Sequence, residues 1–253
     1  MSPMVSRSYG FGPLIFRIDS PVAMKERDFL ETFRVGEDIS PDVTYEIRPE
    51  TEARKPGASP VRLERVGNRL AAYMDISLLP EITAANFLSA ADASSLAVEK
   101  GAFLLHAAHI RYNGEAILFT APSGTGKSTQ AHLWETRRDA EIINEDRALI
   151  FCRDGQYYAA GCWAMGSGTV CRNVTSPIRA IVLLGQGREN TVRALPAYEI
   201  FRRLLPQCTF DEGRVEQQTA IIDRVTELIG CVKTVAYDCV PQPSSVEALE
   251  SWI

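Results

Sequence analysis

The sequence has few of the features that direct a chain to an oxidising compartment, a membrane or a bound metal. Its six cysteines form no Cys-x-x-Cys pair and are too sparse among 253 residues for a disulfide scaffold, so we expect buried, reduced thiols. Three scattered histidines are too few to indicate a zinc site. The longest apolar runs are far too short to cross a bilayer, and residues 1–22 lack the pattern of a secretory signal. We therefore expect a cytoplasmic protein that has no membrane partner.

Neither the charge nor the composition is extreme. Lys and Arg number 27 against 32 Asp and Glu, which gives a formal net charge of −5, and 45% of the residues are hydrophobic. This composition excludes a disordered chain. The mild negative charge excludes a generally basic nucleic-acid binder, so we expect no nucleic-acid partner. The length allows one large domain or two small ones.

Short alternating segments predict a β-rich N-terminal region. Apolar and polar residues alternate in half-buried strands, and Gly or Asn pairs mark the turns between them. An Ala-rich stretch with spaced apolar residues then predicts a helix, which Gly101 would end. The predicted elements are strands at residues 14–18 and 43–47, a hairpin within 61–74 around Gly67-Asn68, and a helix over residues 84–100.

Beyond residue 100 the pattern becomes that of an α/β chain. Asn113-Gly114 and Asp154-Gly155 each separate two apolar runs and predict tight hairpins, because both turn positions need positive φ. We expect residues 1–99 to be a β-rich region plus helix that packs on a core formed by residues 100–253. Further predicted elements are strands at 141–144, 178–184 and 232–237 and helices at 128–137, 197–205, 215–229 and 244–252.

The segment TAPSGTGKST at residues 120–129 fits the P-loop pattern G-x-x-x-x-G-K-[ST], except that Ala121 replaces the first glycine. Glycines let backbone N–H groups surround a phosphate, and the following helix directs its positive end at the anion. Lys127 supplies a point charge to the β- and γ-phosphates, and Ser128 offers a hydroxyl to Mg²⁺. The alternative is a Gly-rich turn without a nucleotide. The candidate nucleotide-binding residues are Ser123, Gly124, Thr125, Gly126, Lys127, Ser128 and Thr129.

A second cluster follows the predicted strand at residues 141–144, which ends in Glu145-Asp146. One helix separates this strand from the strand before the P-loop, as in a βαβ unit, so both carboxyl ends should meet at the same sheet edge. Asp146 is therefore a candidate for binding Mg²⁺ or for accepting a hydroxyl proton. The alternative is a solvated acidic turn.

Hairpin register adds His106 to this site. A two-residue Asn113-Gly114 turn pairs positions whose numbers sum to 227, so His106 falls opposite Ala121 at the mouth of the phosphate loop, unless a bulge shifts the register. The alternative is a core histidine with satisfied hydrogen bonds. His109, on the opposite face, and His132, on the helix, are given no role.

The second hairpin adds two weaker expectations. Around Asp154-Gly155 the paired numbers sum to 309, which sets Trp163 opposite Asp146 and makes residues 161–163 a candidate wall of the site. Residues 166–168, Gly-Ser-Gly, are a candidate loop for acceptor binding or a plain turn.

These motifs carry a family resemblance. Leu105-His106-Ala107, the first hairpin, the segment at residues 122–129 and the strand ending in Glu145-Asp146 resemble the catalytic core of HPr kinase/phosphorylase. They look closer still to the related serine kinases of peptide-modification gene clusters, such as lasso peptide kinases. The resemblance covers about residues 100–240. It implies an α/β fold with a mixed β-sheet P-loop core of the HPr kinase C-terminal-domain type, similar to that of phosphoenolpyruvate carboxykinases.

The resemblance also implies roles for individual residues. In HPr kinase this strand ends in two aspartates, one of which acts as base toward the acceptor serine, whereas this chain has Glu145-Asp146. Glutamate is one methylene longer, so we favour Asp146 as the base and keep Glu145 as a candidate. The family histidine maps onto His106. The residues for phosphorolysis do not map, so the reverse activity is not carried over.

The leading hypothesis is a kinase that uses ATP and Mg²⁺ and phosphorylates a serine-type hydroxyl on a small protein or peptide. Lys127 and the loop amides would hold the phosphates, Ser128 and Asp146 the metal, and His106 would orient or stabilise the γ-phosphoryl group. Two alternatives stay open, namely a kinase of a small-molecule hydroxyl and a nucleotide-binding regulatory protein with vestigial catalysis. The acceptor and the oligomeric state, including a homo-oligomer, stay open as well.

Overall fold

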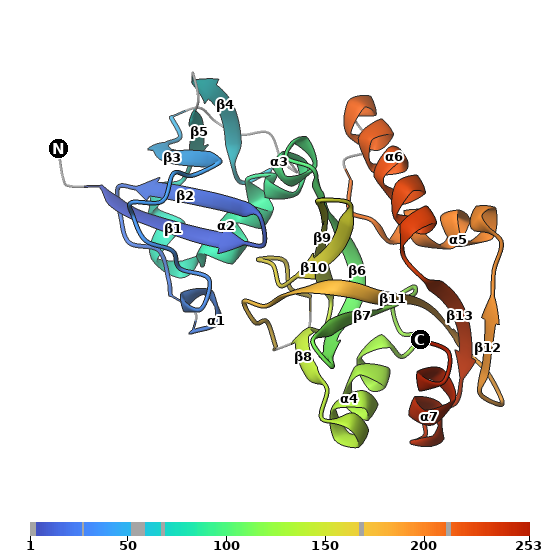
Figure 1. Cartoon of the computed structure of the whole chain (residues 1–253). Helices are drawn as coiled ribbons and strands as arrows, with labels where there is room; N and C mark the ends of the chain where they lie inside the picture. Colours follow the sequence, from blue (N-terminus) through green and yellow to red (C-terminus); the bar gives the residue numbers. More distant parts are fainter. Residues whose placement is uncertain (1–3, 27, 52–58, 67–68, 167–169, 211–213) are drawn as a thin grey trace.

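Two mixed β-sheets organise the chain in the computed structural model, which describes residues 4–26, 28–51, 59–66, 69–166, 170–210 and 214–253. The first sheet has five strands in the order β1-β2-β3-β5-β4 (Figure 1). Parallel pairing of β3 with both β2 and β5 makes it mixed. Its strands are β1 Val5–Phe11, β2 Leu14–Ser20, β3 Val43–Pro49, β4 Arg62–Val66 and β5 Arg69–Met74.

The second sheet has the order β10-β9-β6-β7-β11-β13-β12, with β8 pairing to β6. Strand β10 also pairs with β11, so that β10, β9, β6, β7 and β11 form a closed ring of strands. The strands are β6 Ala102–Tyr112, β7 Glu115–Thr120, β8 Glu141–Asn144, β9 Arg147–Arg153, β10 Gln156–Ala160, β11 Thr175–Gln186, β12 Thr191–Ala194 and β13 Thr234–Cys239.

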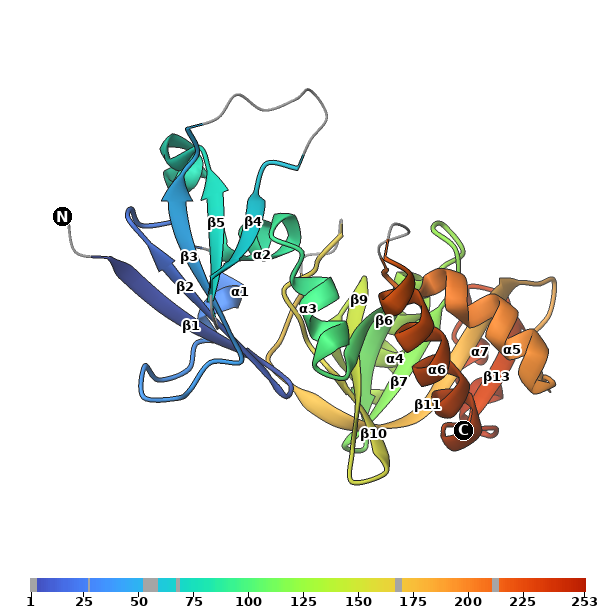
Figure 2. The ribbon, with the colours of Figure 1, turned by 90° about the horizontal axis from the view of Figure 1, so that it is seen from above.

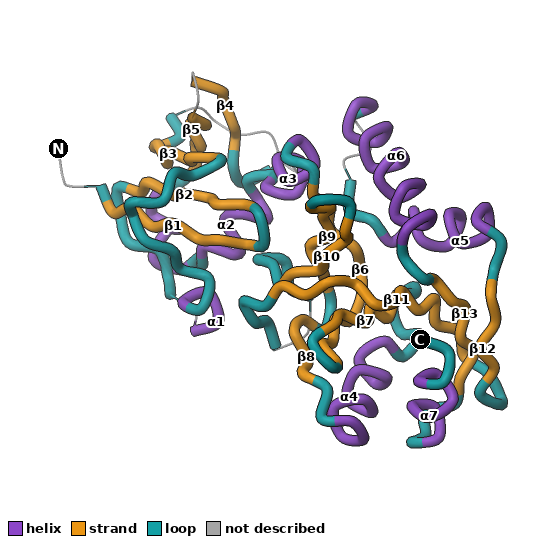
Figure 3. Tube along the Cα trace, in the orientation of Figure 1, coloured by secondary structure: helices purple, strands orange, loops and turns teal. Residues whose placement is uncertain are grey.

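Helices gather mainly around the second sheet, as the tube view shows (Figure 3). Three apolar clusters explain this arrangement: one joins the second sheet to α5 and α6, another joins it to α4 and α7, and the third links both sheets through α2 and α3. The helices are α1 Asp28–Glu31, η1 Ile76–Glu81, α2 Ala84–Ala90, α3 Ala93–Glu99, α4 Lys127–Arg138, α5 Ala197–Leu204, η2 Leu205–Gln207, α6 Val215–Cys231 and α7 Ser244–Glu250. None of the helices in the described ranges is both long and apolar enough to traverse a bilayer.

The predicted single helix over residues 84–100 is wrong, because the chain forms two helices there. Asp92 adopts a left-handed conformation with φ of 56°, which an α-helix cannot contain. Its carboxylate accepts the hydroxyl of Ser95 and pairs with Arg214 at 2.7 Å. The break turns α3 toward β6 and α6, so that α3 lies at the junction of the two sheets (Figure 2).

Both predicted tight hairpins are confirmed. Asn113 and Gly114 have φ of 51° and 84°, and the ladder pairs Ile110 with Ile117 and Ala107 with Thr120, as the sum of 227 requires. Residues 154 and 155 show the same conformation, and β9 and β10 pair with the sum of 309. The hairpin of β4 and β5 is also present, although its predicted turn at Gly67-Asn68 lies outside the described residues.

Strand β6 places the ends of β7 and β8 together. Both strands are antiparallel to β6, which lies between them, so they run parallel to each other. Thr120 at the end of β7 pairs with Ala107, and Asn144 at the end of β8 pairs with His109. The prediction that both strands bring their carboxyl ends to one sheet edge is therefore confirmed.

Trp163 is not a wall of that edge, and this prediction is wrong. Its side chain is only 1% exposed, and its ring packs edge-on against Phe11 and Phe16 at centroid distances of 5.2 and 5.3 Å. These phenylalanines belong to the first sheet. Trp163 therefore packs the segment after β10 against the first sheet, where burial of its indole ring stabilises the contact.

Candidate functional site

The loop between β7 and α4 is shaped to receive an anion. Gly124 and Gly126 have φ of 78° and 111°, a region that residues with side chains rarely adopt. A Cβ built on either glycine would meet no atom within 4 Å, so both face open space. Gly126 is the N-cap of α4 and provides no side-chain cap, which leaves the first amides of the helix available for a ligand.

Lys127 is the buried cation of this loop. Its side chain folds back so that Nζ donates to the carbonyl oxygens of Ala121 at 3.0 Å and Pro122 at 3.3 Å. Burial lowers the pKa of Lys127, and the charge of Asp146 opposes that effect. The methyl group of Ala121 packs in the cluster that joins the sheet to α4, which explains why a side chain is tolerated at the first position of the motif.

Asp146 lies between a histidine and an arginine. His106 Nε2 is 3.4 Å from Oδ1 of Asp146, and Arg147 Nε is 3.6 Å from Oδ2. The hydrogen bond from His106 is the largest cause that holds the pKa of Asp146 below its usual value, with smaller contributions from the charges of Arg147 and Lys127. Lys127, His106 and Asp146, which the sequence analysis predicted to meet, are thus brought together.

The turn that carries Asp146 is fixed by hydrogen bonds to its backbone groups. The amides of Asp146 and Arg147 both donate to Oδ1 of Asn144 at 2.9 Å, and the carbonyl of Asp146 accepts the amide of Ala107 at 3.0 Å. Gly166 lies against the carboxylate, because a Cβ there would be 2.6 Å from Cγ of Asp146. The other residues of the predicted acceptor loop, Ser167 and Gly168, lie outside the described residues.

Glu145 points away from this group. Its carboxylate lies 3.1 Å from Nε2 of His132 on α4, and it accepts the amide of Val170 at 3.3 Å. The side chain is only 11% exposed. Glu145 therefore connects α4 to the chain at Val170, and His132, which had been given no role, is its partner.

Beside the phosphate loop lies a cleft of about 440 Å³. Its walls come from the loop, the first turns of α4 and the carboxyl ends of β11 and β13, which run parallel to β7. Ligands of α/β sheets bind at such ends. The lining residues are Gly124, Thr125, Gly126, Thr129, Gln130, Gln186, Gly187, Cys239 and Pro241.

Sequence reasoning missed three polar side chains near the phosphate loop. Gln186 donates from Nε2 to the carbonyl of Gly124 at 3.4 Å, and Cys239 is a half-buried free thiol whose pKa burial raises. Arg147 is the third. Gln186 and Cys239 could have been found as the last residues of two apolar strands, whereas nothing in the local pattern marks Arg147 apart from its place after Asp146.

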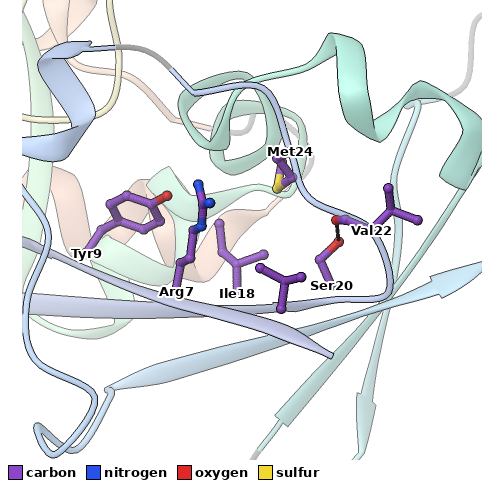
Figure 4. A pocket seen from close by; sticks show the side chains of 7 residues that line it. Arg7, Tyr9, Ile18, Ser20, Val22 and Met24 are labelled. Carbon is purple, nitrogen blue, oxygen red and sulfur yellow. Dashed lines mark hydrogen bonds between the residues drawn. The ribbon is translucent and has the colours of Figure 1, made fainter. Parts of the chain in front are cut away.

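One face of the first sheet has a much smaller cavity. Between β1, β2 and the segment at residues 22–24 lies a cavity of about 10 Å³, which is room for about one water molecule (Figure 4). Arg7, Tyr9, Ser20 and Met24 are among the side chains around it, and the hydroxyl of Ser20 donates to the carbonyl of Val22 at 2.6 Å. A nucleotide does not fit there.

The residues at the phosphate loop fit a bound Mg²⁺ in chemistry. Ser128 is exposed on the first turn of α4, and Asp146 provides one carboxylate. Mg²⁺ commonly takes one or two carboxylates together with substrate phosphates and water. Within the described ranges, no three His, Cys, Asp or Glu side chains are grouped to hold a metal by themselves.

Comparison with known proteins gives one family model and one solved structure to report. The model of the family SynChlorMet cassette protein ScmC matches residues 88–205. No curated protein matches the chain. Among solved structures, the Hpr(Ser) kinase/phosphatase from Coxiella burnetii is similar with 11% sequence identity and a TM-score of 0.35, over 58% of this chain and 93% of that one.

Proposed function

We propose that this chain is a phosphotransferase that uses ATP and Mg²⁺ and transfers the γ-phosphoryl group to a serine-type hydroxyl of a small protein or peptide. The observation that supports this most is the meeting of two groups at one sheet edge. A Gly-Lys-Ser loop with open amides and a buried lysine lies beside an aspartate that a histidine contacts. A phosphate cradle next to an ionised carboxylate is what phosphoryl transfer to a hydroxyl needs.

The phosphate loop and the cleft beside it accommodate different parts of the nucleotide. The cleft at the ends of β11 and β13 takes the nucleoside, and the loop amides from Ser123 to Thr129 with the Lys127 ammonium take the phosphates. Ser128 and Asp146 would hold Mg²⁺, which would neutralise negative charge on the phosphates. The acceptor then approaches from the side of Asp146 and His106.

Asp146 is the base in this proposal, rather than Glu145. Its carboxylate is about one quarter exposed and lies with Lys127 and His106, whereas the carboxylate of Glu145 is turned to His132. Because its pKa is lowered, Asp146 is ionised at neutral pH and can accept the hydroxyl proton. Such a weak base suffices where the transition state is loose and the hydroxyl is deprotonated late.

The fold class in this proposal is the P-loop core of the HPr kinase C-terminal-domain type, formed by the second sheet with α4 to α7. The order of β7, the phosphate loop, α4 and β8 supports it. The first sheet is the β-rich N-terminal part, which packs on this core through one apolar cluster.

The test is transfer of label from ATP labelled at the γ-phosphate, in the presence of Mg²⁺, to a library of serine-containing peptides and, separately, to small hydroxyl compounds. We expect label on serine with wild-type protein and none with Lys127→Ala. Label only on small hydroxyl compounds would overturn the peptide or protein acceptor. ATP binding without transfer to any acceptor would overturn the kinase and favour a regulatory nucleotide-binding protein.

A further inference from the structure

Arg147 is a cation of the site for which neither the motif nor the resemblance provides a role. It is the first residue of β9 and pairs with His106 across the β6–β9 ladder. Cross-strand partners lie on the same face of a sheet. Arg147 and His106 therefore reach the carboxylate of Asp146 from two neighbouring strands, one at each oxygen.

The contact between Arg147 and Asp146 is loose. Nε lies 3.6 Å from Oδ2, beyond hydrogen-bond distance, and the structure gives the guanidinium no hydrogen bond with any side chain or carbonyl of the described ranges. An arginine has five N–H donors in a rigid fork that suits the oxygens of carboxylates and phosphates. Its side chain is about 30% exposed, so a ligand can reach it.

The site carries more positive than negative charge. Lys127 and Arg147 are near enough for the charge of Arg147 to lower the pKa of Lys127, and a single carboxylate, that of Asp146, lies with them. The neighbouring carboxylate, Glu145, is occupied by His132 and the amide of Val170. Two cations held together with one anion form a site for a further anion.

We propose that Arg147 binds the terminal phosphoryl group of the triphosphate, a role that rests on the proposed function. Its guanidinium leaves Oδ2 of Asp146 and donates to the γ-phosphate oxygens, while Lys127 holds the β- and γ-phosphates. Oδ2 is then free to face the acceptor, while Oδ1 keeps its contact with His106 and is the oxygen that would also hold Mg²⁺. Binding of the triphosphate thus uncovers the carboxylate oxygen that the reaction needs.

Bonds and protons balance in the transfer step. The hydroxyl oxygen of the acceptor forms a bond to the γ-phosphorus, the bond from that phosphorus to the bridging oxygen breaks, and ADP leaves with the electron pair. The hydroxyl proton goes to Oδ2 of Asp146. Arg147 neutralises charge on the phosphoryl oxygens during the transfer and is neither protonated nor deprotonated.

Comparison of ATP with ADP tests this role, because only ATP carries the terminal phosphoryl group. Titration calorimetry with both nucleotides, with Mg²⁺ and again with EDTA, compares wild type, Arg147→Gln, Arg147→Lys and the matched control Arg153→Gln. Arg153 is six residues along the same strand and lies over Phe151 and Tyr158, away from the loop.

We expect Arg147→Gln to weaken ATP binding about 10- to 100-fold with ADP binding unchanged, because a charged hydrogen-bond donor to the γ-phosphate is lost. Arg147→Lys keeps the charge but not the forked donors, so its ATP affinity should lie between those of wild type and Arg147→Gln. Arg153→Gln should bind ATP as wild type does. The loss persists in EDTA if the guanidinium contacts phosphate directly.

Three results would overturn the role. ATP affinity unchanged in Arg147→Gln would do so, as would an equal loss for ATP and ADP, since the contact would then not involve the terminal group. A loss that disappears in EDTA would show that Arg147 acts only through Asp146 and the metal. Wild-type protein that binds neither nucleotide would instead overturn the proposed function, and the role of Arg147 with it.

Discussion

The outer face of the first sheet and one edge of the second sheet use the same charged residue types in opposite ways. On the outer face of the first sheet, arginines and carboxylates form matched pairs: Arg17 Nε lies 2.8 Å from Asp19, and Arg48 Nη2 lies 3.0 Å from Glu46. At the edge of the second sheet, Lys127 and Arg147 lie with one carboxylate, and a cleft opens beside the phosphate loop. Balanced pairs stabilise a surface, whereas an excess of one charge prepares a site for a ligand.

The largest effect should come from Lys127→Ala. Removing the ammonium takes away the only charge that the loop itself offers to the phosphates, so we expect loss of ATP binding and at least a ~10³-fold loss of phosphoryl transfer. Arg69→Ala, which removes a cation from the first sheet that lies 3.7 Å from Asp19, is the control and should leave transfer intact. Equal losses in the two variants would erase the distinction between the sheets.

The next largest effect on phosphoryl transfer should come from Asp146, with Asp19 of the first sheet as its control. Asp146→Asn removes the proposed base, so we expect about a 10³-fold loss of transfer while thermal unfolding stays cooperative. Asp19→Asn removes a carboxylate that accepts Ser6 at 2.7 Å and Arg17 at 2.8 Å, and should cost about 1 kcal/mol of stability with transfer retained. Labelled-phosphate transfer and thermal melts, measured on both variants, test whether Asp146 acts in transfer and Asp19 in stability. Full activity of Asp146→Asn would refute its role as base.

His106→Ala should have a smaller effect on transfer, on the order of 10²-fold. The imidazole lies 3.4 Å from Asp146, and its loss removes the largest cause of the lowered pKa of that carboxylate. Steady-state kinetics with saturating ATP measure the effect. A wild-type rate would assign His106 to packing alone.

Much of this site could be predicted because local chemistry dictates it. Positive φ at Asn113 and Gly114 fixes the hairpin, the hairpin fixes the register, and the register brings His106 to the strand end beside the phosphate loop. The same logic failed for Trp163. Its register position was extrapolated beyond Ala160, where the paired part of β10 ends, and apolar packing against Phe11 then determined where the ring lies.

Side-chain direction was the part that the pattern could not provide. Two adjacent carboxylates read alike in sequence, yet Glu145 turns to α4 and Asp146 to His106, because the turn that Asn144 closes holds them apart. Likewise, a single apolar periodicity over residues 84–100 gave no sign of the left-handed Asp92, whose partner Arg214 is distant in sequence.

His109 provides a contrast on the same strand as His106. It is fully buried, and neither ring nitrogen has a hydrogen-bond partner in the described part of the chain, so burial lowers its pKa to about 3. The unfolded chain binds a proton near pH 6.5 and the folded chain does not, so stability falls as the pH drops below 6.5. The loss from this residue reaches about 2 kcal/mol at pH 5 relative to pH 7.

His109→Leu should remove that acid dependence without a change in transfer at pH 7. Urea unfolding at pH 7 and pH 5 measures it, with His132→Leu as the control, because His132 is half exposed. An unchanged difference between the two pH values in His109→Leu would contradict the assignment.

Glu145→Gln should have the smallest effect on the reaction, less than about tenfold. The amide oxygen of Gln can still accept the backbone N–H of Val170, and its amide group can still hydrogen-bond the imidazole of His132. The connection from α4 to Val170 therefore weakens without breaking. A loss as large as that of Asp146→Asn would make Glu145 a second reacting carboxylate. Glu145→Gln and His132→Leu could instead each cause a small loss of the same size, with no further loss in the double variant. That result would identify a single positioning contact between the two residues, because one interaction cannot be lost twice.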